Sequence, residues 1–178
     1  MARLKDMNQQ NIYIEWLVLK TQGGDQQALN DLLDCIRPRL VSYARRLLSD
    51  PADADDCVQD ALWVVCRKLH QLREPKAFHG WMYRVINSRC QDFWRRQKPA
   101  SPLEDQDIAT ADTTAPAGAV SAVANALGQL AVADAAVVHL FYFEGFTVGE
   151  ISQILEKPAG TVKSMLFQAR AHIKSLLT

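Results

Sequence analysis

Residues 78–96 of the chain read FHGWMYRVINSRCQDFWRR. Five aromatic residues and four arginines are mixed in this stretch, and no proline interrupts it. As a helix, it has an apolar flank to bury and a cationic, aromatic flank to expose. The second flank suits a single strand of nucleic acid, because arginines attract phosphates and exposed rings stack on unpaired bases. The alternative is an amphipathic core helix whose arginines are merely solvated.

The composition of the whole chain narrows the classes of protein that it fits. Its 178 residues allow one large domain or two small ones, and a hydrophobic fraction of 48% is enough for a packed core. A formal net charge of zero argues against a uniformly basic nucleic-acid binder but leaves room for local patches. There is no apolar run of membrane-spanning length and no signal-peptide pattern. We therefore expect a cytoplasmic protein without direct membrane insertion.

The residues that usually carry chemistry show no catalytic or metal-binding spacing. The cysteines lie in apolar, helix-like stretches without a C-x-x-C pair, which favours buried reduced thiols over a zinc or redox site. The histidines lie near no serine or cysteine with nucleophile context, and no phosphate-binding loop is present. We expect no enzymatic activity, no cofactor, no metal and no small-molecule substrate. The four cysteines are Cys35, Cys57, Cys66 and Cys90.

An acidic helix precedes the aromatic stretch. Asp50 is a good N-cap and Pro51 fits the first helical position. Five aspartates and no basic residue lie between positions 50 and 60. Complementarity to the helix dipole accounts for one or two acids, so the surplus points to a basic protein partner. These acids are Asp50, Asp53, Asp55, Asp56 and Asp60.

The segments further upstream divide at Gly23-Gly24. Residues 1–11 have no clear period, which predicts a loose lead-in, and an apolar stretch follows from Ile12. Asp25 is a candidate N-cap for the next helix, in which Pro38 predicts a break or kink.

Residues 97–119 predict a flexible, acidic linker rich in proline, alanine and threonine, and the altered composition continues to about residue 125. A flexible coil of the 29 residues from 97 to 125 has a root-mean-square span of roughly 30 Å and reaches about 100 Å when extended. The prediction is an all-α protein with two small helical domains, residues 12–96 and 120–178.

The second domain contains a helix-turn-helix pattern. Thr147 and Glu150 form a capping box that opens a short helix, and a break follows at residues 156–158. A longer helix then begins at about Ala159. This succession is typical of DNA-binding helix-turn-helix domains, although many all-α domains contain such a corner.

Two separate sets of motifs resemble one family. DADDCVQD at 53–60, FHGWMYRV at 78–85 and DFWRR at 92–96 resemble region two of bacterial RNA polymerase sigma factors. EGFT at 144–147, EI at 150–151, PAGTVKS at 158–164 and AR at 169–170 resemble their region four. Two such domains and a linker are the layout of the extracytoplasmic-function (ECF) group. The resemblance implies a transcription initiation factor that binds core RNA polymerase, recognises promoter DNA and assists strand opening.

For the first domain, the resemblance implies two binding surfaces. The acidic helix would dock on the basic clamp coiled coil of core polymerase through Asp53, Asp56, Gln59 and Asp60. The aromatic stretch would capture unpaired bases of the −10 element, with at least one of its tryptophans in the core instead. The residues implied for the −10 element are Trp81, Tyr83, Arg84, Asn87, Ser88, Trp94, Arg95 and Arg96.

For the second domain, the resemblance implies recognition of a −35 element about 17 base pairs away, or ~60 Å along the duplex. Residues 120–178 carry four basic and four acidic residues, which predicts weak DNA binding by this domain alone. Glu156 stands where glycine is usual in the turn. The residues implied for the −35 element are Lys157, Thr161, Lys163, Ser164, Phe167, Gln168 and Arg170.

The neutral second domain keeps an alternative open. In that interpretation the chain is a sigma-like interaction module whose C-terminal domain mainly binds a regulatory partner rather than DNA. The resemblance implies that such a partner is an anti-sigma factor.

Overall fold

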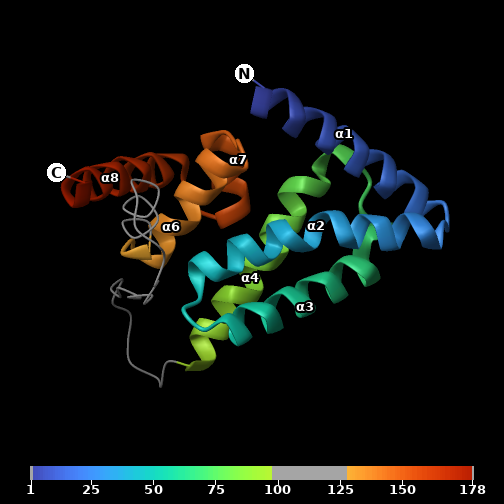
Figure 1. Ribbon diagram of the computed structural model, residues 1–178, viewed down its shortest axis with the longest axis horizontal. Coiled ribbons are helices and arrows are strands. Elements are labelled where there is room, and N and C mark those ends of the chain that lie inside the picture. Colours follow the sequence, from blue (N-terminus) through green and yellow to red (C-terminus); the bar gives the residue numbers. More distant parts are fainter. Residues whose placement is uncertain (1, 98–127, 178) are drawn as a thin grey trace.

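The computed structural model describes residues 2–97 and 128–177 (Figure 1). Within these residues the chain is helical and contains no β-strand, which confirms the predicted fold class. One group of helices forms the first domain: α1 (Ala2–Gln22), α2 (Gln26–Leu47), α3 (Pro51–Lys68) and α4 (Phe78–Gln97). The second domain consists of α6 (Val132–Val138), the π-helical turn η3 (His139–Phe143), α7 (Val148–Leu155) and α8 (Ala159–Leu177).

Two helices of the first domain begin where the sequence predicts. The carboxylate of Asp25 accepts hydrogen bonds from the backbone N–H groups of Gln27 and Ala28, which satisfies two free donors at the start of α2. The carboxylate of Asp50 does the same for the backbone N–H of Ala52, at 2.7 Å, at the start of α3. Both predicted N-caps are confirmed.

The start of the chain differs from the prediction. Residues 1–11 were expected to be loose, but α1 begins at Ala2, so this prediction is wrong. α2 holds the part of this helix next to its buried stripe: Arg39 donates to the side-chain oxygens of Gln10, at 2.7 Å, and Asn11, at 3.4 Å. A polar anchor of this kind leaves no apolar period in the sequence.

Proline 38 does not end its helix. α2 runs through Pro38, because Ile36 and Leu40 on either side of it are fully buried in the core. The packing of this stripe outweighs the backbone hydrogen bond that proline cannot donate. Of the predicted break or kink, the break is therefore absent.

Two 3₁₀ turns connect α3 to α4. They are η1 (Leu69–Gln71) and η2 (Pro75–Ala77). The side-chain amide of Gln22, the last residue of α1, donates to the backbone carbonyls of Leu69, at 2.9 Å, and Leu72, at 2.7 Å. The end of α1 therefore fixes the turn from which α4 starts.

The second domain has the predicted helix-turn-helix. Thr147 Oγ1 accepts from the backbone N–H of Glu150, and Glu150 Oε2 accepts from the backbone N–H of Thr147 at 2.8 Å, so the capping box is confirmed. Glu156 ends α7 with φ 55°, in the left-handed region. This conformation explains why glycine suits that position.

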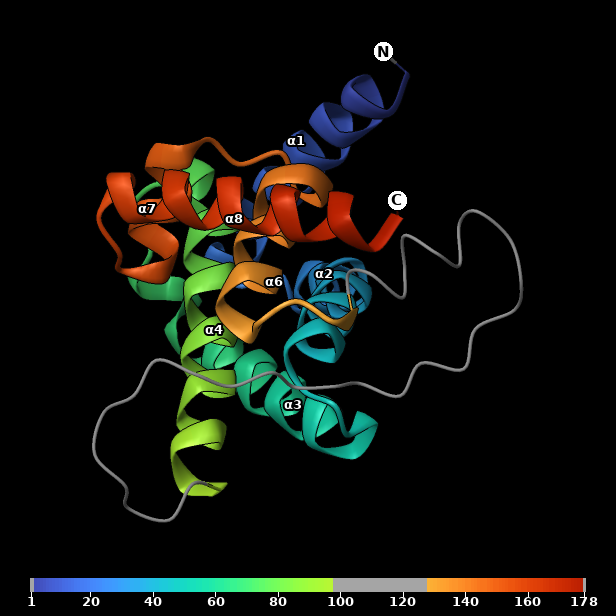
Figure 2. The ribbon, with the colours of Figure 1, turned by 90° about the vertical axis from the view of Figure 1, so that its left-hand side faces the viewer.

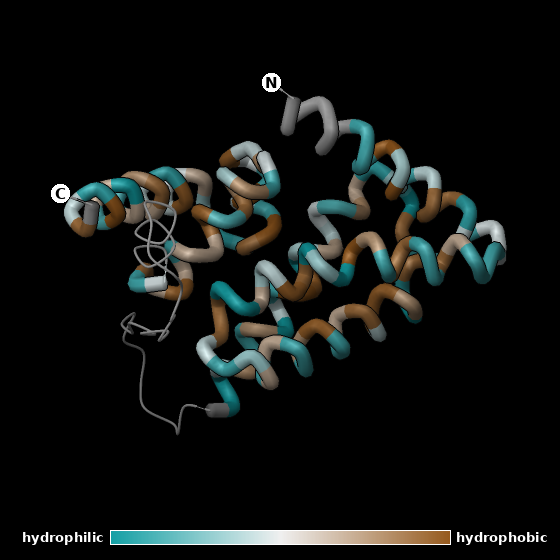
Figure 3. Tube along the Cα trace, in the orientation of Figure 1, coloured by the Kyte–Doolittle hydropathy of each residue, from teal (hydrophilic) through white to brown (hydrophobic). Residues whose placement is uncertain are grey.

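The two domains pack against each other. α6 lies beside α2 and α7 lies beside α4 (Figures 1 and 2). Hydrophobic residues recur along the helices of both domains (Figure 3), and the buried ones form one continuous cluster that crosses the boundary between them. Apart from Gln97, which ends α4, the predicted linker at 97–119 lies outside the described residues.

Candidate protein and nucleic-acid interfaces

An acidic surface covers the outer side of α3. Asp56, Gln59 and Asp60 are exposed there, and Asp53 is half-buried. The three exposed side chains line one wall of a groove of about 320 Å³ between α3 and α4, with Phe93 among the residues of the opposite wall. The structure thus brings the predicted polymerase-binding residues together on one face.

One residue of this face was missed by the sequence reasoning. Trp63 follows Gln59 and Asp60 by four and three positions, so it lies on the same side of α3 one turn further on. Its side chain is 61% exposed, and the guanidinium of Arg67 lies 4.5 Å from the centre of its ring. The helical spacing from Gln59 was the signal that could have identified it.

The far end of α4 presents the cationic surface that the sequence predicts. Ser88, Arg95 and Arg96 are exposed. Trp94 is half-buried, and its indole N–H donates to the backbone carbonyl of Leu47 at 3.3 Å. Trp81 is also half-buried and packs on Phe78. Both tryptophans therefore combine a packed side with an accessible one.

Two other predicted −10 residues are buried. The hydroxyl of Tyr43 donates to Asn87 Oδ1 at 3.0 Å inside the first domain. The ring of Tyr83 packs between Tyr43 and Phe146, with ring centroids 5.4 Å and 5.5 Å away. Contrary to the prediction, Tyr83 and Asn87 are not available to a DNA strand in this arrangement, because Tyr83 is covered by the second domain and Asn87 by the first.

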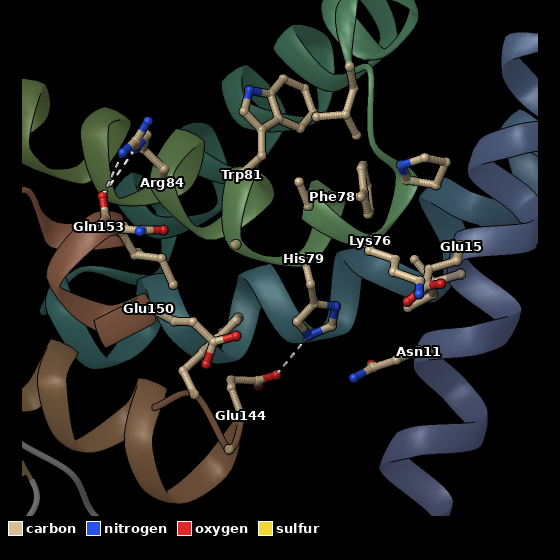
Figure 4. A pocket seen from close by; sticks show the side chains of 18 residues that line it. Asn11, Glu15, Lys76, Phe78, His79, Trp81, Arg84, Glu144, Glu150 and Gln153 are labelled. Carbon is tan, nitrogen blue, oxygen red and sulfur yellow. Dashed lines mark hydrogen bonds and ion pairs between the residues drawn. The ribbon is translucent and has the colours of Figure 1, made fainter. Parts of the chain in front are cut away.

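Arg84 is engaged by the second domain as well. Its Nε and Nη2 atoms donate to the backbone carbonyl of Gln153, at 3.2 Å and 2.7 Å (Figure 4). Its Nε also lies 3.7 Å from Glu156 Oε1. The Gln153 carbonyl lies in the last turn of α7, where carbonyls lack partners within the helix. A cation at this helix end is also favoured by the helix dipole.

A buried charged cluster lies between the domains. The side chain of Glu144, 10% exposed, follows η3 and points into the first domain. Its carboxylate lies 3.4 Å from His139 Nε2, 3.7 Å from His79 Nε2 and 4.0 Å from Arg39 Nη1. Arg39 Nη1 and His79 Nε2 are 2.9 Å apart. Figure 4 shows Glu144 reaching toward His79 across the boundary.

The pKa values in this cluster reflect burial and its polar neighbours. Burial would raise the pKa of the Glu144 carboxyl, but His139, His79 and Tyr83 around it hold that pKa well below its usual range. Burial lowers the pKa of His139, and burial together with the Glu144 charge raises the pKa of the Tyr83 hydroxyl. Glu144 is therefore a carboxylate and His139 a neutral imidazole at neutral pH.

The outer face of α8 carries the residues predicted for the −35 element. Val162, Met165, Leu166 and Ala169 are buried, so the positions between them face outward. Phe167 is 73% exposed, and Arg170 donates through Nε to the hydroxyl of Tyr142 at 2.6 Å. Lys157 is half-buried in the turn. The exposed residues of this face are Thr161, Lys163, Ser164, Phe167, Gln168 and Arg170.

Residues 2–97 and 128–177 offer no group of three or more histidine, cysteine, aspartate or glutamate side chains suited to a metal ion. In the part of the chain that the structure describes, no helix combines the length and the apolar character needed to cross a bilayer.

Comparison with known families places both domains. Residues 32–100 match Sigma-70 region 2, and residues 121–173 match Sigma-70 region 4. The ECF RNA polymerase sigma factor SigM of Mycobacterium tuberculosis is 34% identical over 157 residues, covering 87% of this chain and 80% of that protein. The ECF RNA polymerase sigma-E factor of Escherichia coli K12 is 27% identical over 173 residues, covering 88% of this chain and 90% of that protein.

Solved structures share the fold. The sigma factor RpoE of Bartonella quintana, in complex with the anti-sigma factor NepR, gives a TM-score of 0.66 at 20% identity, covering 83% of this chain and 95% of that one. CnrH, in complex with the cytosolic domain of CnrY, gives a TM-score of 0.67 at 22% identity, covering 93% of this chain and 97% of that one. With both regions matched in order, and a relative at 34% identity along most of its length, the chain belongs to the ECF sigma factors of RNA polymerase.

Proposed function

We propose that this sigma factor acts in the cytoplasm, without catalysis of its own, by docking on core RNA polymerase through α3 and gripping promoter DNA through α4 and α8. The observation that carries the proposal is the arrangement of charge in the first domain. Aspartates gather on the exposed side of α3, and the exposed Arg95 and Arg96 lie at the far end of α4, with Arg96 on the opposite wall of the same groove. One domain can thus bind a basic protein and an acidic polymer at the same time.

Docking on polymerase rests on the surface formed by Asp53, Asp56, Gln59, Asp60 and Trp63. Acids attract the basic clamp coiled coil and set its register. An exposed tryptophan beside them supplies apolar area of the kind that often dominates binding energy at interfaces. Trp63 thereby extends the surface implied by the family resemblance.

Capture of the −10 element rests on the exposed half of α4. Arg95 and Arg96 are placed to contact phosphates, and Ser88 to donate or accept a hydrogen bond. The accessible sides of Trp81 and Trp94 offer rings on which unpaired bases can stack.

Recognition of the −35 element rests on α8. Thr161, Lys163, Ser164 and Gln168 are candidates for base edges in the major groove, and Lys157 and Arg170 for phosphates. The neutral charge of this domain makes it the weaker of the two DNA contacts. Control by an anti-sigma factor is part of the proposal, since the sigma factor RpoE, which shares this fold, was solved in complex with the anti-sigma factor NepR.

Reconstituted transcription tests the function. Purified protein and core polymerase are incubated with a fragmented genomic library, and the transcript 5′ ends are sequenced. We expect defined start sites that share sequence near −10 and −35 and that neither component produces alone. Failure to bind core polymerase would disprove the proposal. Titration of a −35 duplex separates the alternative, because a purely regulatory C-terminal domain would bind no duplex even at low salt.

A further inference from the structure

We propose that Cys57 and Cys90 form a dithiol site between α3 and α4 that a peroxide oxidises to a disulfide. Cys57 reacts with the peroxide, and Cys90 then closes the disulfide with it. The inference goes beyond transcription initiation, because neither the sequence motifs nor the family match gives either thiol a role.

Folding assembles the pair from two helices. Cys57 lies on α3 and Cys90 on α4, which pack side by side (Figures 1 and 2). The Cys57 thiol donates to the backbone carbonyl of Arg89, directly before Cys90, at 3.8 Å. The two thiols also share a hydrogen bond. Sulfurs in such contact need only side-chain rotation and a short approach to reach the bond length of about 2.05 Å in a disulfide.

The two thiols differ in their access to a reagent. Cys57 is 4% exposed and is among the residues that line the groove of about 320 Å³ between α3 and α4. Cys90 is 1% exposed and does not line that groove. A molecule as small as hydrogen peroxide can therefore reach Cys57 from the groove before it reaches Cys90. This division matches a thiol that is oxidised beside a thiol that resolves it.

The hydrogen bond between the thiols also determines which of them ionises. It lowers the pKa of Cys57, against the opposing effects of burial and of the aspartate charges on α3. The same bond, together with burial, raises the pKa of Cys90. Because the thiolate is the nucleophile, Cys57 is the sulfur that attacks a peroxide. The aspartates are Asp53, Asp56 and Asp60.

The reaction needs no oxidant besides the peroxide. The Cys57 thiolate attacks one oxygen of hydrogen peroxide, a sulfur–oxygen bond forms as the oxygen–oxygen bond breaks, and the released hydroxide takes up a proton to become water. The Cys90 sulfur then attacks the resulting sulfenic acid, and the hydroxyl group leaves with the Cys90 proton as a second water. The two thiols lose two electrons, and the peroxide gains them.

Oxidation of a two-thiol variant tests the site in the full chain. Of the other cysteines, Cys35 is half-buried, and Cys66 is exposed, contrary to the sequence-based prediction of buried thiols. Cys35→Ser combined with Cys66→Ser leaves only Cys57 and Cys90. The control keeps only the exposed Cys66, through Cys35→Ser, Cys57→Ala and Cys90→Ala. Both proteins are treated with hydrogen peroxide without denaturant, and mass spectrometry follows the intact mass and the linked peptides.

We expect the two-thiol variant to lose two hydrogen atoms and to yield a peptide pair joined through Cys57 and Cys90. This reaction should be no slower than the oxidation of Cys66 in the control, although burial by itself would make it slower. Dithiothreitol should restore both thiols. If Cys57 and Cys90 stay reduced while Cys66 is oxidised, or if their disulfide forms only in urea, the proposal is overturned.

Single substitutions in the two-thiol variant assign the two roles. With Cys90→Ala, Cys57 should gain oxygen, because its sulfenic acid has no thiol to resolve it. With Cys57→Ala, Cys90 should stay reduced at the same concentration of peroxide. Oxygen on Cys90 but not on Cys57 would contradict the proposed order.

The dithiol site and the initiation function fail in different ways. Asp56, Gln59 and Asp60 of the proposed docking surface line the same groove as Cys57. Core polymerase in excess should therefore slow the oxidation of the pair severalfold, an expectation that rests on the proposed function. Oxidation that polymerase does not slow would count against docking through α3, whereas the mass measurement on the free chain alone decides the dithiol site.

Discussion

Helices α4 and α8 are the two helices expected to touch DNA, and they differ in what covers them. α8 buries one face in its own domain and exposes the other, including Phe167 at 73%. α4 buries one face in its own domain and has a second one that α7 and the residues before it contact: Tyr83 is covered there, and Arg84 donates to the end of α7. When a helix packs only within its own domain, its sequence periodicity indicates which face is free to bind. When it also packs against a distant part of the chain, the periodicity does not.

The largest expected effect comes from a matched pair of phenylalanines in the second domain. Phe146, 8% exposed, packs on α4, whereas Phe167 projects from α8. Phe146→Ala should lower the free energy of unfolding by about 3 kcal/mol, because it empties a packed site between the domains. Phe167→Ala should change it by less than about 0.5 kcal/mol and weaken only −35 duplex binding. Urea unfolding of both variants measures the difference. Equal losses would mean that Phe167 is covered in solution.

The exposed half of α4 supplies the next effect. Arg95→Ala combined with Arg96→Ala removes two cations that the second domain does not cover. We expect the rate of promoter opening by the holoenzyme to fall roughly thirtyfold, since charge-assisted phosphate contacts are lost. This change corresponds to a rise of about 2 kcal/mol in the activation free energy of opening. Binding to core polymerase, measured by fluorescence anisotropy, should be unchanged. Loss of both activities together would show that this end of α4 is structural.

Acid should destabilise the packing of the second domain against α4 and leave the fold of α8 largely unaffected. The folded-state pKa of His139 and that of Glu144 both lie below their ordinary values. The folded chain therefore binds fewer protons than the unfolded chain, so stability is present above the ordinary pKa of each group and is lost as pH falls below it.

His139 acts first and Glu144 second. The thermal midpoint should fall as pH drops from about 7 to 5 through His139, and again below about 4.5 through Glu144. The other charged or titratable groups facing these two are Arg39, Arg46, His79 and Tyr83. Calorimetry across this range measures both steps, and Glu144→Gln should remove the second. A midpoint that rises on acidification would contradict the assignment of Glu144 as the buried anion.

Within the first domain, the bond between Tyr43 and Asn87 gives a smaller effect. Tyr43→Phe keeps the ring but leaves Asn87 Oδ1 without its donor in a buried position. The expected cost is about 1–2 kcal/mol of folding stability. Tyr13→Phe, at a 45% exposed ring of the same domain, is the control and should cost nearly nothing. If both variants unfold at the same urea concentration, Asn87 finds another partner and could turn toward DNA.

Features set by neighbouring residues were predictable from the sequence, and features set by distant ones were not. The caps at Asp25 and Asp50 depend on contacts within four residues, and both were predicted. Residues 10 and 11 of α1 are held by Arg39 of another helix, and the prediction that this segment is loose was wrong. The pairing of Glu144 with Arg39 and His79 joins residues far apart in the chain, and nothing in their local spacing marks it.

The same distinction explains the two tryptophans of α4. We predicted that at least one of them would be packed in the core, but the sequence did not indicate which. Both are half-buried, because Trp94 is tied to the carbonyl of Leu47 and Trp81 is packed on Phe78. The choice depends on the tertiary packing of α2 and the turn before α4, which a single sequence does not encode in its periodicity.

The turn before α8 provides the smallest effect and the sharpest test of local reasoning. Glu156 adopts φ 55°, a left-handed conformation that costs a residue with a Cβ roughly 1 kcal/mol and costs glycine nothing. Glu156→Gly should therefore stabilise the second domain by up to about 1 kcal/mol, less the entropy that glycine loses on folding. Glu156→Ala removes the same carboxylate near Arg84 but keeps the strained backbone, so it should bring no gain. Urea unfolding compares the two variants. If Glu156→Ala stabilised the second domain as much as Glu156→Gly, the source of the destabilisation would be the carboxylate of Glu156 rather than its left-handed backbone.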